Sequence, residues 1–330
     1  MALILRESDA RALLTMPDVL RWVEDSIRAQ GDGLARVHPR QRVNAPKGTL
    51  HTLQAAELKL GVLGVKSYTV FKEGRSFLFL LYSADNGKLL ALIEANYFSM
   101  MRTGAASAIA TKYMAREDAS VMAMFGTGLQ TGGQIEAINL VRPLKQVRVY
   151  SRNAERRANL SREMSERLGV EVTPASSPEE ALDGADIVTT ATTSMNPLFS
   201  GELIKPGTHV NAVGANALIR REIDEELVRK ANVIVVDSRP TAKTECGDLF
   251  STVEKGLLEW DMLPELAEVV VGRVPGRHNP KDITLFESHG TALEDLAVTM
   301  PMYRLALEKG VGEEITLCEN QNWSVGYYGV

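Results

Sequence analysis

The stretch Ser120–Leu140, SVMAMFGTGLQTGGQIEAINL, decides the fold class. Its first part has the apolar pattern of a buried strand that ends at Phe125, and its second part carries apolar residues at helical spacing from Thr131 onward. Between them, Gly126 permits a tight turn, and Gly128 lets the backbone approach a pyrophosphate at the N-terminus of the helix. The third glycine of the dinucleotide motif G-x-G-x-x-G is absent, so a glycine-rich turn without a ligand is the alternative.

The alternation of strand and helix patterns continues around this turn, from Ala119 to Asp237. A capping box with a proline at the first helical position begins at Ser177 and marks one more helix. The expected strands are Ser120–Phe125, Gln146–Tyr150, Ile187–Ala191, Thr208–Val213 and Val233–Asp237, and the longer expected helices are Thr131–Leu140 and Glu155–Leu168. This order is typical of a parallel sheet covered by helices, as in the Rossmann fold.

The sequence on the N-terminal side of this unit has a different pattern, in which strands follow one another with short turns between them. The expected strands are Thr49–Leu53, Val62–Phe71, Phe77–Ser83 and Lys88–Ala95, and helices are expected at Pro17–Ala29, Asn96–Met114 and Thr291–Lys309. We therefore expect an α/β fold in which a Rossmann dinucleotide-binding domain, residues 116–301, is inserted in a mixed α+β domain, residues 1–115 plus 302–330. The tail Cys318–Val330 has no periodicity and receives no assignment.

Composition excludes several classes of protein. The 330 residues carry 37 Lys and Arg against 42 Asp and Glu, a formal net charge of −5, with 45 % hydrophobic and 24 % charged residues. This mild acidity argues against a nucleic-acid-binding protein, and the balance of apolar and charged residues excludes a disordered or fibrous chain. Two cysteines, Cys246 and Cys318, are too few for a disulfide framework. With no signal-peptide pattern and no apolar run of about 20 residues, we expect a soluble cytoplasmic protein without a membrane partner.

The end of the second expected strand, Tyr150-Ser151-Arg152-Asn153, bears on the choice of cofactor. A dinucleotide fold that prefers NAD places an acidic residue here to bind the ribose 2′-hydroxyl, and this chain has no acid at that place. Ser151 can donate a hydrogen bond and Arg152 can pair with a 2′-phosphate, so we predict NADPH, with NADH as the weaker cofactor. The alternative is that Arg152 belongs to the solvated face of the next helix.

Six spaced segments of the chain resemble the ornithine cyclodeaminase/μ-crystallin family, from about Arg42 to Leu317. They are Gly64–Lys66, Met101–Ala106, Gly126–Gln130, Ala185–Val188, Asn211–Ala215 and Ser288–Asp295. The resemblance implies a Rossmann domain, a second domain that binds substrate and forms a homodimer, and chemistry at an amino- or imino-acid carbon beside a nicotinamide. Members of the family include ornithine and lysine cyclodeaminases, an alanine dehydrogenase, and reductases of cyclic ketimines such as pyrroline-2-carboxylate.

The glycine motif and the resemblance together predict the residues around the cofactor. They are Gly126, Thr127, Gly128, Leu129, Gln130, Ser151, Arg152, Asn153, Ala191, Thr192, Val213, Gly214, His289 and Gly290.

Three cations in the first domain match family positions that hold the substrate carboxylate: Arg42, Lys66 and Arg102. Lys66 stands in an otherwise apolar strand, so its ammonium must reach solvent or meet a buried partner, and a bound carboxylate would be such a partner. Arg42 stands in an expected loop. The alternatives are a lysine on an edge strand, an arginine on a surface loop, and an ion pair of Arg102 with Glu94 or another acid.

Two departures from the family pattern concern the reaction. Where a cyclodeaminase has a proton-carrying aspartate this chain has Asn216, and His51 occupies the place of another acid. A cyclodeaminase needs a general base twice, whereas reduction of a preformed imine needs a hydride, a carboxylate clamp and polar contacts at nitrogen. We therefore predict an NAD(P)H-dependent imine reductase or amino-acid dehydrogenase with Lys66, His51 and Asn216 as catalytic candidates. The alternatives are a cyclodeaminase that recycles NAD internally and a non-catalytic, μ-crystallin-like protein that binds NADPH and a ligand.

Two histidines are candidates for the proton donor. The pKa range of histidine would allow this role for His51, although a lone histidine in a strand is more often structural. His289 lies in a loop expected beside the nicotinamide, and His38, His209 and His278 have no partner arrangement. Metal-ligand spacing such as H-E-x-x-H is absent, so we predict no metal.

Overall fold

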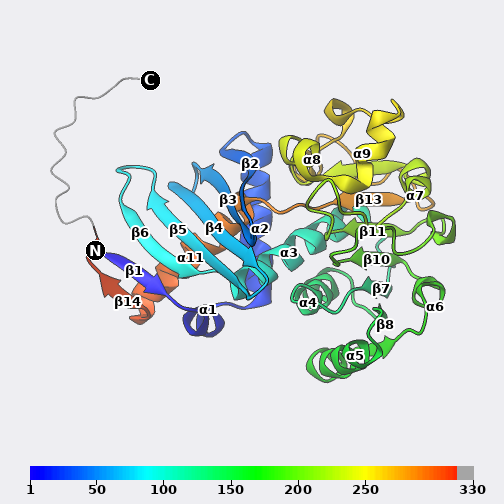
Figure 1. The fold of residues 1–330 in the computed structure, drawn as a ribbon, viewed down its shortest axis with the longest axis horizontal. Coiled ribbons are helices and arrows are strands. Elements are labelled where there is room, and N and C mark those ends of the chain that lie inside the picture. Colours follow the sequence, from blue (N-terminus) through cyan, green and yellow to red (C-terminus); the bar gives the residue numbers. More distant parts are fainter. Residues whose placement is uncertain (318–330) are drawn as a thin grey trace.

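The computed structural model describes residues 1–317, and the unassigned tail from Cys318 to Val330 lies outside the described residues. Two seven-stranded sheets lie side by side, with the helix α3 (Tyr97–Met114) between them (Figure 1). In the described chain no helix combines the length and the apolar character that crossing a membrane requires.

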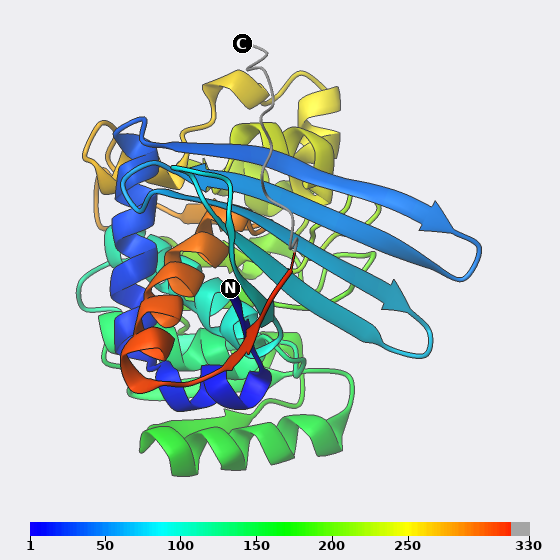
Figure 2. The same cartoon turned by 90° about the vertical axis from the view of Figure 1, so that its left-hand side faces the viewer.

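The first sheet has the strand order β14-β1-β6-β5-β4-β3-β2. Its strands are β1 (Ala2–Leu5), β2 (Ala35–Ala45), β3 (Gly48–Glu57), β4 (Val62–Phe71), β5 (Arg75–Ser83), β6 (Leu89–Glu94) and β14 (Glu313–Ile315). The strands β2 to β6 form an antiparallel meander, and β1 pairs in parallel with β6 and antiparallel with β14. The helices beside this sheet are α1 (Glu7–Leu13), α2 (Met16–Gly31) and α11 (Ala292–Lys309), and α2 and α11 lie next to each other on one face (Figure 2).

The second sheet has the order β12-β13-β11-β10-β7-β8-β9, and all its neighbours are parallel, which confirms the predicted parallel unit. Its strands are β7 (Val121–Phe125), β8 (Gln146–Tyr150), β9 (Glu171–Pro174), β10 (Ile187–Thr190), β11 (His209–Ala212), β12 (Val233–Val236) and β13 (Thr284–Glu287). Its helices are α4 (Thr131–Val141), α5 (Ala154–Leu168), α6 (Pro178–Leu182), α7 (Glu225–Lys230), α8 (Arg239–Glu245), α9 (Gly247–Glu254) and α10 (Leu266–Val270), with 3-10 turns at Gly201–Leu203 and Trp260–Met262. The strands β9 and β13, the latter next to the edge strand β12, were not among the predicted strands.

Arg42 lies in the strand β2, so its predicted place in a loop is wrong. β2 is the edge strand of the first sheet, and its register with β3 shifts between His38 and Gln41, on either side of Pro39. A proline has no amide hydrogen for a sheet, and it is tolerated at edges and bulges. The proline and the mostly exposed polar residues of β2 hide its strand pattern from the sequence.

The returning helix α11 leaves the second sheet and packs against the first. A Cβ on Gly64 of β4 would lie 2.7 Å from a methyl carbon of Leu296, so the glycine lets the helix approach the sheet. α11 continues as one helix through Pro301, where the predicted domain boundary falls. The division into residues 116–301 and the two flanking segments stays a prediction.

The small residues of α3 have a packing role. A Cβ on Gly104 would lie 2.3 Å from the carbonyl oxygen of Gly133 in α4, so only glycine permits this close contact between the two helices. α3 is therefore fixed against the helix that follows the glycine-rich turn, which places Arg102 of α3 near the second sheet.

Candidate active site

The turn after β7 has the shape expected of a phosphate-binding turn. Gly126 has φ 118°, and a Cβ on it would lie 2.6 Å from the carbonyl oxygen of Ala191, so the position requires glycine. A Cβ on Gly128 would meet nothing within 4 Å, which leaves the space in front of α4 open. This open turn at a helix N-terminus fits the pyrophosphate of a dinucleotide.

The residues at the end of β8 lie beside this turn. Thr127 Oγ1 donates a hydrogen bond to Ser151 Oγ at 3.4 Å, which links the turn to the predicted ribose-binding segment. Asn153 is the N-cap of α5, and its Oδ1 accepts a hydrogen bond from the amide of Arg156 at 2.9 Å. Arg152 is exposed, and within residues 1–317 its side chain has no hydrogen bond or ion pair. Its guanidinium is therefore free to bind an anion, whereas the side chain of Asn153 is already engaged.

Glu222, which the sequence reasoning did not single out, ties together the loops that follow β10 and β11. Its carboxylate accepts hydrogen bonds from the amides of Thr192 at 2.5 Å and Gly214 at 2.6 Å, and from Oγ1 of Thr190 at 2.8 Å. Burial raises the pKa of Glu222, and these donors oppose that rise. Glu222 thus fixes the two loops in which Ala191, Thr192, Val213 and Gly214 were predicted to contact the cofactor.

The loop after β13 is fixed by a second buried carboxylate, Asp237. Its Oδ2 accepts hydrogen bonds from the amides of His289 at 2.6 Å and Gly290 at 2.7 Å, and its Oδ1 lies 3.1 Å from Nδ1 of His289. The imidazole of His289 is fully buried. The backbone of this loop lies against α3, because a Cβ on Gly290 would lie 2.6 Å from a guanidinium nitrogen of Arg102.

Lys66 and Arg102 share one buried acid. Lys66 Nζ donates hydrogen bonds to Asp295 Oδ1 at 2.9 Å and to Ser99 Oγ at 2.6 Å. Arg102 donates to the same oxygen of Asp295 at 3.0 Å and to Glu294 Oε2 at 2.5 Å. The lysine is thus buried beside an internal partner, and Arg102 pairs with acids of α11 rather than with Glu94. Burial lowers the pKa of Lys66 to about 8.

A second cation pair, Arg40 and Arg42, shares Glu245. Arg40 Nη1 donates to Glu245 Oε2 at 2.9 Å, and its Nη2 donates to the carbonyl oxygen of His289 at 2.7 Å. Arg42 Nη2 lies 2.9 Å from Glu245 Oε1 and donates to the carbonyl oxygen of Asn216 at 2.8 Å. Arg40 was not predicted as a site residue. Both arginines connect the edge strand of the first sheet to the loops of the second.

The two remaining catalytic candidates have defined surroundings. The rings of His51 and Tyr68 stack with centroids 4.4 Å apart, and burial together with the nearby Arg42 and Arg40 lowers the pKa of His51 to about 4. At neutral pH His51 is therefore uncharged. Asn216 Oδ1 accepts a hydrogen bond from Arg220 at 2.8 Å, so its amide orients another cation.

Tyr68 is a site residue that the sequence reasoning missed. Burial raises its pKa, and Arg40, Arg42 and Arg102 all lie close enough to affect it electrostatically. Its phenol is thus near Arg40 and near two of the predicted carboxylate-binding cations, Arg42 and Arg102. Only its place in an alternating strand, two residues after Lys66, could have indicated this from the sequence.

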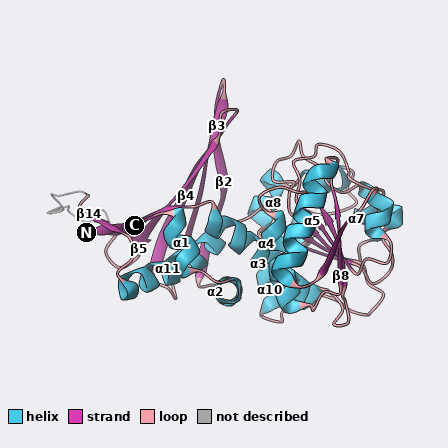
Figure 3. Cartoon of the chain, turned by 90° about the horizontal axis from the view of Figure 1, so that it is seen from below, coloured by secondary structure: helices cyan, strands magenta, loops and turns pink. Residues whose placement is uncertain are grey.

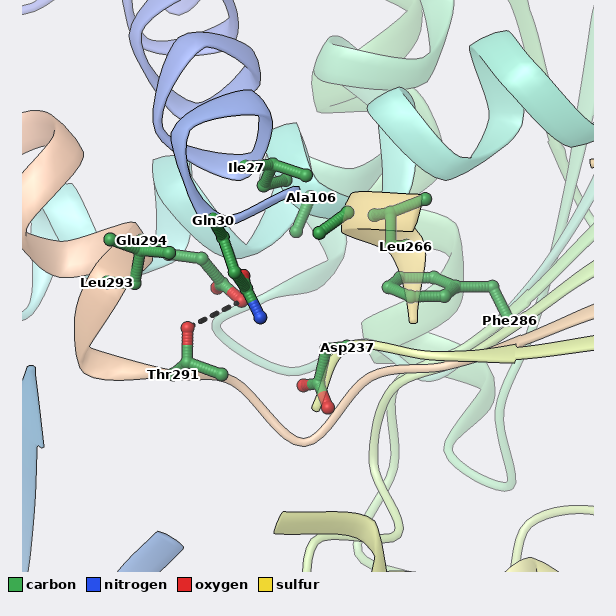
Figure 4. A pocket seen from close by; sticks show the side chains of 10 residues that line it. Ile27, Gln30, Ala106, Asp237, Leu266, Phe286, Thr291, Leu293 and Glu294 are labelled. Atoms are coloured by element: carbon green, nitrogen blue, oxygen red, sulfur yellow. Dashed lines mark hydrogen bonds between the residues drawn. The ribbon is translucent and has the colours of Figure 1, made fainter. Parts of the chain in front are cut away.

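A small cavity lies behind these residues, between α2, α3, α10 and α11 (Figure 4). Asp237, Glu294, Gln30 and Thr291 supply its polar lining, and Thr291 Oγ1 donates a hydrogen bond to Glu294 at 3.4 Å. Its volume is about 10 Å³, space for about one water molecule. The cavity is too small for an amino acid, and it shares Glu294 with the ion pairs of Arg102.

Comparisons with known proteins identify the family and the fold. The model of the ornithine cyclodeaminase/mu-crystallin family matches residues 2–310. A Delta(1)-pyrroline-2-carboxylate reductase from Bacillus cereus is 33 % identical over 325 residues, covering 95 % of this chain and 99 % of that protein. The structure of Thermococcus litoralis Delta(1)-pyrroline-2-carboxylate reductase in complex with NADH and L-proline has a TM-score of 0.91 at 35 % identity and covers 95 % of this chain and 100 % of its own.

An archaeal alanine dehydrogenase dimer with bound NAD has a TM-score of 0.89 at 31 % identity, covering 96 % of this chain and 99 % of its own. These similarities confirm the predicted α/β fold with a Rossmann dinucleotide-binding unit. The match of the family model over nearly the whole described chain confirms the predicted family. The chain belongs to the ornithine cyclodeaminase/mu-crystallin family.

Proposed function

We propose that this protein is an NAD(P)H-dependent reductase of a cyclic ketimine carboxylate such as pyrroline-2-carboxylate. The observation that carries the proposal is the contact between cations of β2 and α3 and the loops of the second sheet. Arg40 binds the loop after β13, Arg42 binds the loop after β11, and Arg102 lies against Gly290. In a Rossmann fold the nicotinamide lies at the carboxyl ends of the strands, so these cations would hold a carboxylate beside it.

The charges of this region favour an anionic substrate. Four cations, Arg40, Arg42, Lys66 and Arg102, form ion pairs with three carboxylates, Glu245, Glu294 and Asp295. Burial raises the pKa of Glu245 against the opposing effect of Arg40 and Arg42. Burial also raises the pKa of Glu294 to about 7, so Glu294 carries only part of its negative charge at neutral pH. The excess positive charge is available to a substrate carboxylate. Arg42 is the most accessible of the four, with 27 % of its side chain exposed, and is the proposed first contact.

The residues present fit a reduction that needs little proton transfer. When bound, the reduced nicotinamide supplies a hydride to the imine carbon, and the electron pair of the broken π bond moves to the nitrogen. If the imine is already protonated, this step yields the neutral amine directly, so the protein has only to bind the carboxylate and align the carbon. Asn216, which cannot exchange a proton, is compatible with this step and unfavourable for a cyclodeaminase.

We also propose that NADPH is the preferred cofactor. Arg152 is exposed and uncompensated by any acid of the described chain at the end of β8, where a ribose 2′-phosphate would lie. Ser151 is linked to the phosphate-binding turn through Thr127. Fluorescence titration with NADPH and NADH tests this preference, and tighter binding of NADH would contradict it.

We further propose that the protein is a cytoplasmic homodimer and that the open face of the first sheet is its interface. The helices α1, α2 and α11 all lie on one side of this sheet, and no helix of the described chain covers the other side (Figure 3). Exposed apolar residues, namely Val43, Leu50, Leu63, Phe71 and Leu78, share that open face by their strand register. Exposed apolar residues gathered on an uncovered sheet face are typical of an interface between proteins.

A substrate comparison tests the reaction. Absorbance of the reduced nicotinamide should fall when NADPH and pyrroline-2-carboxylate are supplied together, whereas ornithine with catalytic cofactor should release no ammonia. Release of ammonia from ornithine without net cofactor oxidation would instead identify a cyclodeaminase. Tight NADPH binding with no turnover of cyclic ketimines, or of 2-oxo acids with amines, would identify a non-catalytic binding protein.

A further inference from the structure

A cluster of three potential metal ligands lies behind the loop that follows β13. Cys246 joins α8 to α9, Glu287 is the last residue of β13, and His289 follows two residues later. The thiol sulfur, a carboxylate oxygen and a ring nitrogen of these residues all lie within 4.8 Å of one another, and all three residues are buried. The cluster has no part in the ion pairs of the proposed substrate site.

Two of these side chains have buried atoms without a hydrogen-bond partner. Within residues 1–317, Nε2 of His289 and Oε1 of Glu287 accept or donate no hydrogen bond. The imidazole of His289 is 0 % exposed, and Glu287 is 1 % exposed. A buried polar atom without a hydrogen-bond partner lowers the stability of the fold, and a bound ion at this point would supply the missing interaction.

The ring of His289 is held in an orientation suited to metal binding. Oδ1 of Asp237 lies 3.1 Å from Nδ1 of His289, and Oδ2 accepts hydrogen bonds from the backbone amides of His289 and Gly290. The same carboxylate therefore fixes both the ring and the backbone of His289. A carboxylate on one ring nitrogen is the usual arrangement around a metal-binding histidine, because it leaves the other nitrogen free to coordinate. That nitrogen is the unpartnered Nε2.

The charges around the cluster favour a cation. Glu222, Asp237, Asp248 and Glu287 are all buried in this region, and no lysine or arginine of the described chain forms an ion pair with any of them. Burying carboxylates without compensating positive charge is costly, and a metal ion is one of the few groups that can supply it at a closed site.

We propose that Cys246, Glu287 and His289 bind a divalent transition-metal ion of the zinc class. Thiolate, imidazole and carboxylate form a donor set that zinc accepts in tetrahedral sites, with a fourth position left open. Cys246 lies 41 positions before Glu287, so no short spacing motif reveals the cluster in the sequence. On binding, the thiol gives up its proton to solvent and forms the metal–sulfur bond, with no change of oxidation state. The ion would tie the end of β13 to the start of α9.

Cobalt titration of the full chain tests the proposal, because a thiolate bound to Co²⁺ gives a charge-transfer band in the near ultraviolet. The chain contains only two cysteines, and Cys318→Ser removes the one outside the described residues. After treatment with a chelator, the C318S protein is expected to develop this band up to one equivalent of Co²⁺ and to lose it when Zn²⁺ is added. Since Cys246 is then the only thiol, a band assigns the cysteine even if Cys246→Ser fails to fold. No band with C318S would overturn the proposal.

Glu287→Gln tests the second ligand. This change keeps the size of the side chain and removes its charge, so the affinity of the C318S background for Co²⁺ is expected to fall by at least about tenfold. Circular dichroism of the metal-free proteins checks that both fold. An unchanged cobalt affinity would show that Glu287 is not a ligand and would overturn the site as assigned.

Discussion

The substrate end and the ribose end of the proposed site hold their cations in different ways. At the substrate end the side chains of Lys66 and Arg102 are 3 % and 8 % exposed, and both contact Asp295. At the ribose end Arg152 is exposed and has no ion pair within the described chain. A buried charge depends on its partners for stability, whereas an exposed charge is already solvated. Changes at the substrate end should therefore affect folding and turnover together, and changes at the ribose end should affect cofactor binding alone.

Lys66→Met is expected to have the largest effect and is the strongest test of this contrast. Loss of one partner of a buried ion pair costs about 3–5 kcal/mol, and loss of a charge-assisted contact with a substrate carboxylate should lower kcat/KM by about 10- to 100-fold. Urea denaturation and NADPH oxidation measure the two effects. Lys145→Met, which changes an exposed lysine, is the control and should leave both values unchanged. Intact turnover by K66M would contradict the assigned substrate site.

Glu222→Gln tests whether a buried residue outside the substrate site affects cofactor binding through the loops that it holds. The carboxylate of Glu222 accepts hydrogen bonds from three donors, and the amide of glutamine would turn an N–H group toward one of them. One hydrogen bond is therefore lost, and the loops after β10 and β11 are held less firmly. At about 1–3 kcal/mol for the unsatisfied group, the KM for NADPH should rise about tenfold or more, with a smaller change in kcat. Glu226→Gln, on the exposed side of the next helix, is the matched control. An unchanged KM would remove Glu222 from the cofactor site.

The sequence predicts the local structure of the ribose end better than the contacts of the substrate end, because the former depends on residues that are close in the chain. The strand, the turn at Gly126 and the helix from Thr131 are continuous in the chain, and the structure places Ser151 beside that turn. The partners at the substrate end are distant in sequence, as for Lys66 and Asp295, 229 positions apart. No periodicity or motif could identify such a partner.

The residues missed by the sequence reasoning have a common property. Arg40 and Glu245 are 205 positions apart in the sequence. Glu222 accepts hydrogen bonds from the amides of Thr192 and Gly214, which precede it by 30 and 8 positions. Each acts through tertiary contacts that exist only when the two sheets, or two loops, are already in place. β2 was missed for a different reason, since the proline at its bulge interrupts the alternation of a strand.

Arg152→Ala is expected to have a selective effect at the ribose end. Removing the charge should weaken NADPH binding about tenfold, the value of one charge-assisted hydrogen bond, and leave NADH binding unchanged within about twofold. Stability should not change, because the side chain is exposed. Arg156→Ala, an exposed arginine of the following helix, is the control. Equal weakening of both cofactors would place Arg152 away from the 2′-phosphate.

His51→Gln is expected to have the smallest effect on turnover, although His51 lies at the substrate end. With a pKa of about 4 the imidazole is neutral at pH 7 and cannot donate a proton as imidazolium, so kcat/KM at pH 7 should stay within about twofold of the wild type. If the wild-type rate fell as the pH rose through neutrality and H51Q lost that dependence, His51 would instead be the proton donor.

Stability should respond to this histidine only in acid. The folded pKa of about 4 lies below the ordinary value of 6.5, so the unfolded chain binds a proton between these values that the folded chain does not. Lowering the pH through this window therefore destabilises the wild type, and His51→Gln should remove that part of the loss. Because the ring is partly exposed and screened by solvent, the difference in unfolding free energy between pH 7 and pH 5 should be below about 1 kcal/mol. Urea denaturation of both proteins at the two pH values measures it, and a wild type no more acid-sensitive than H51Q would show that His51 titrates normally in the folded protein.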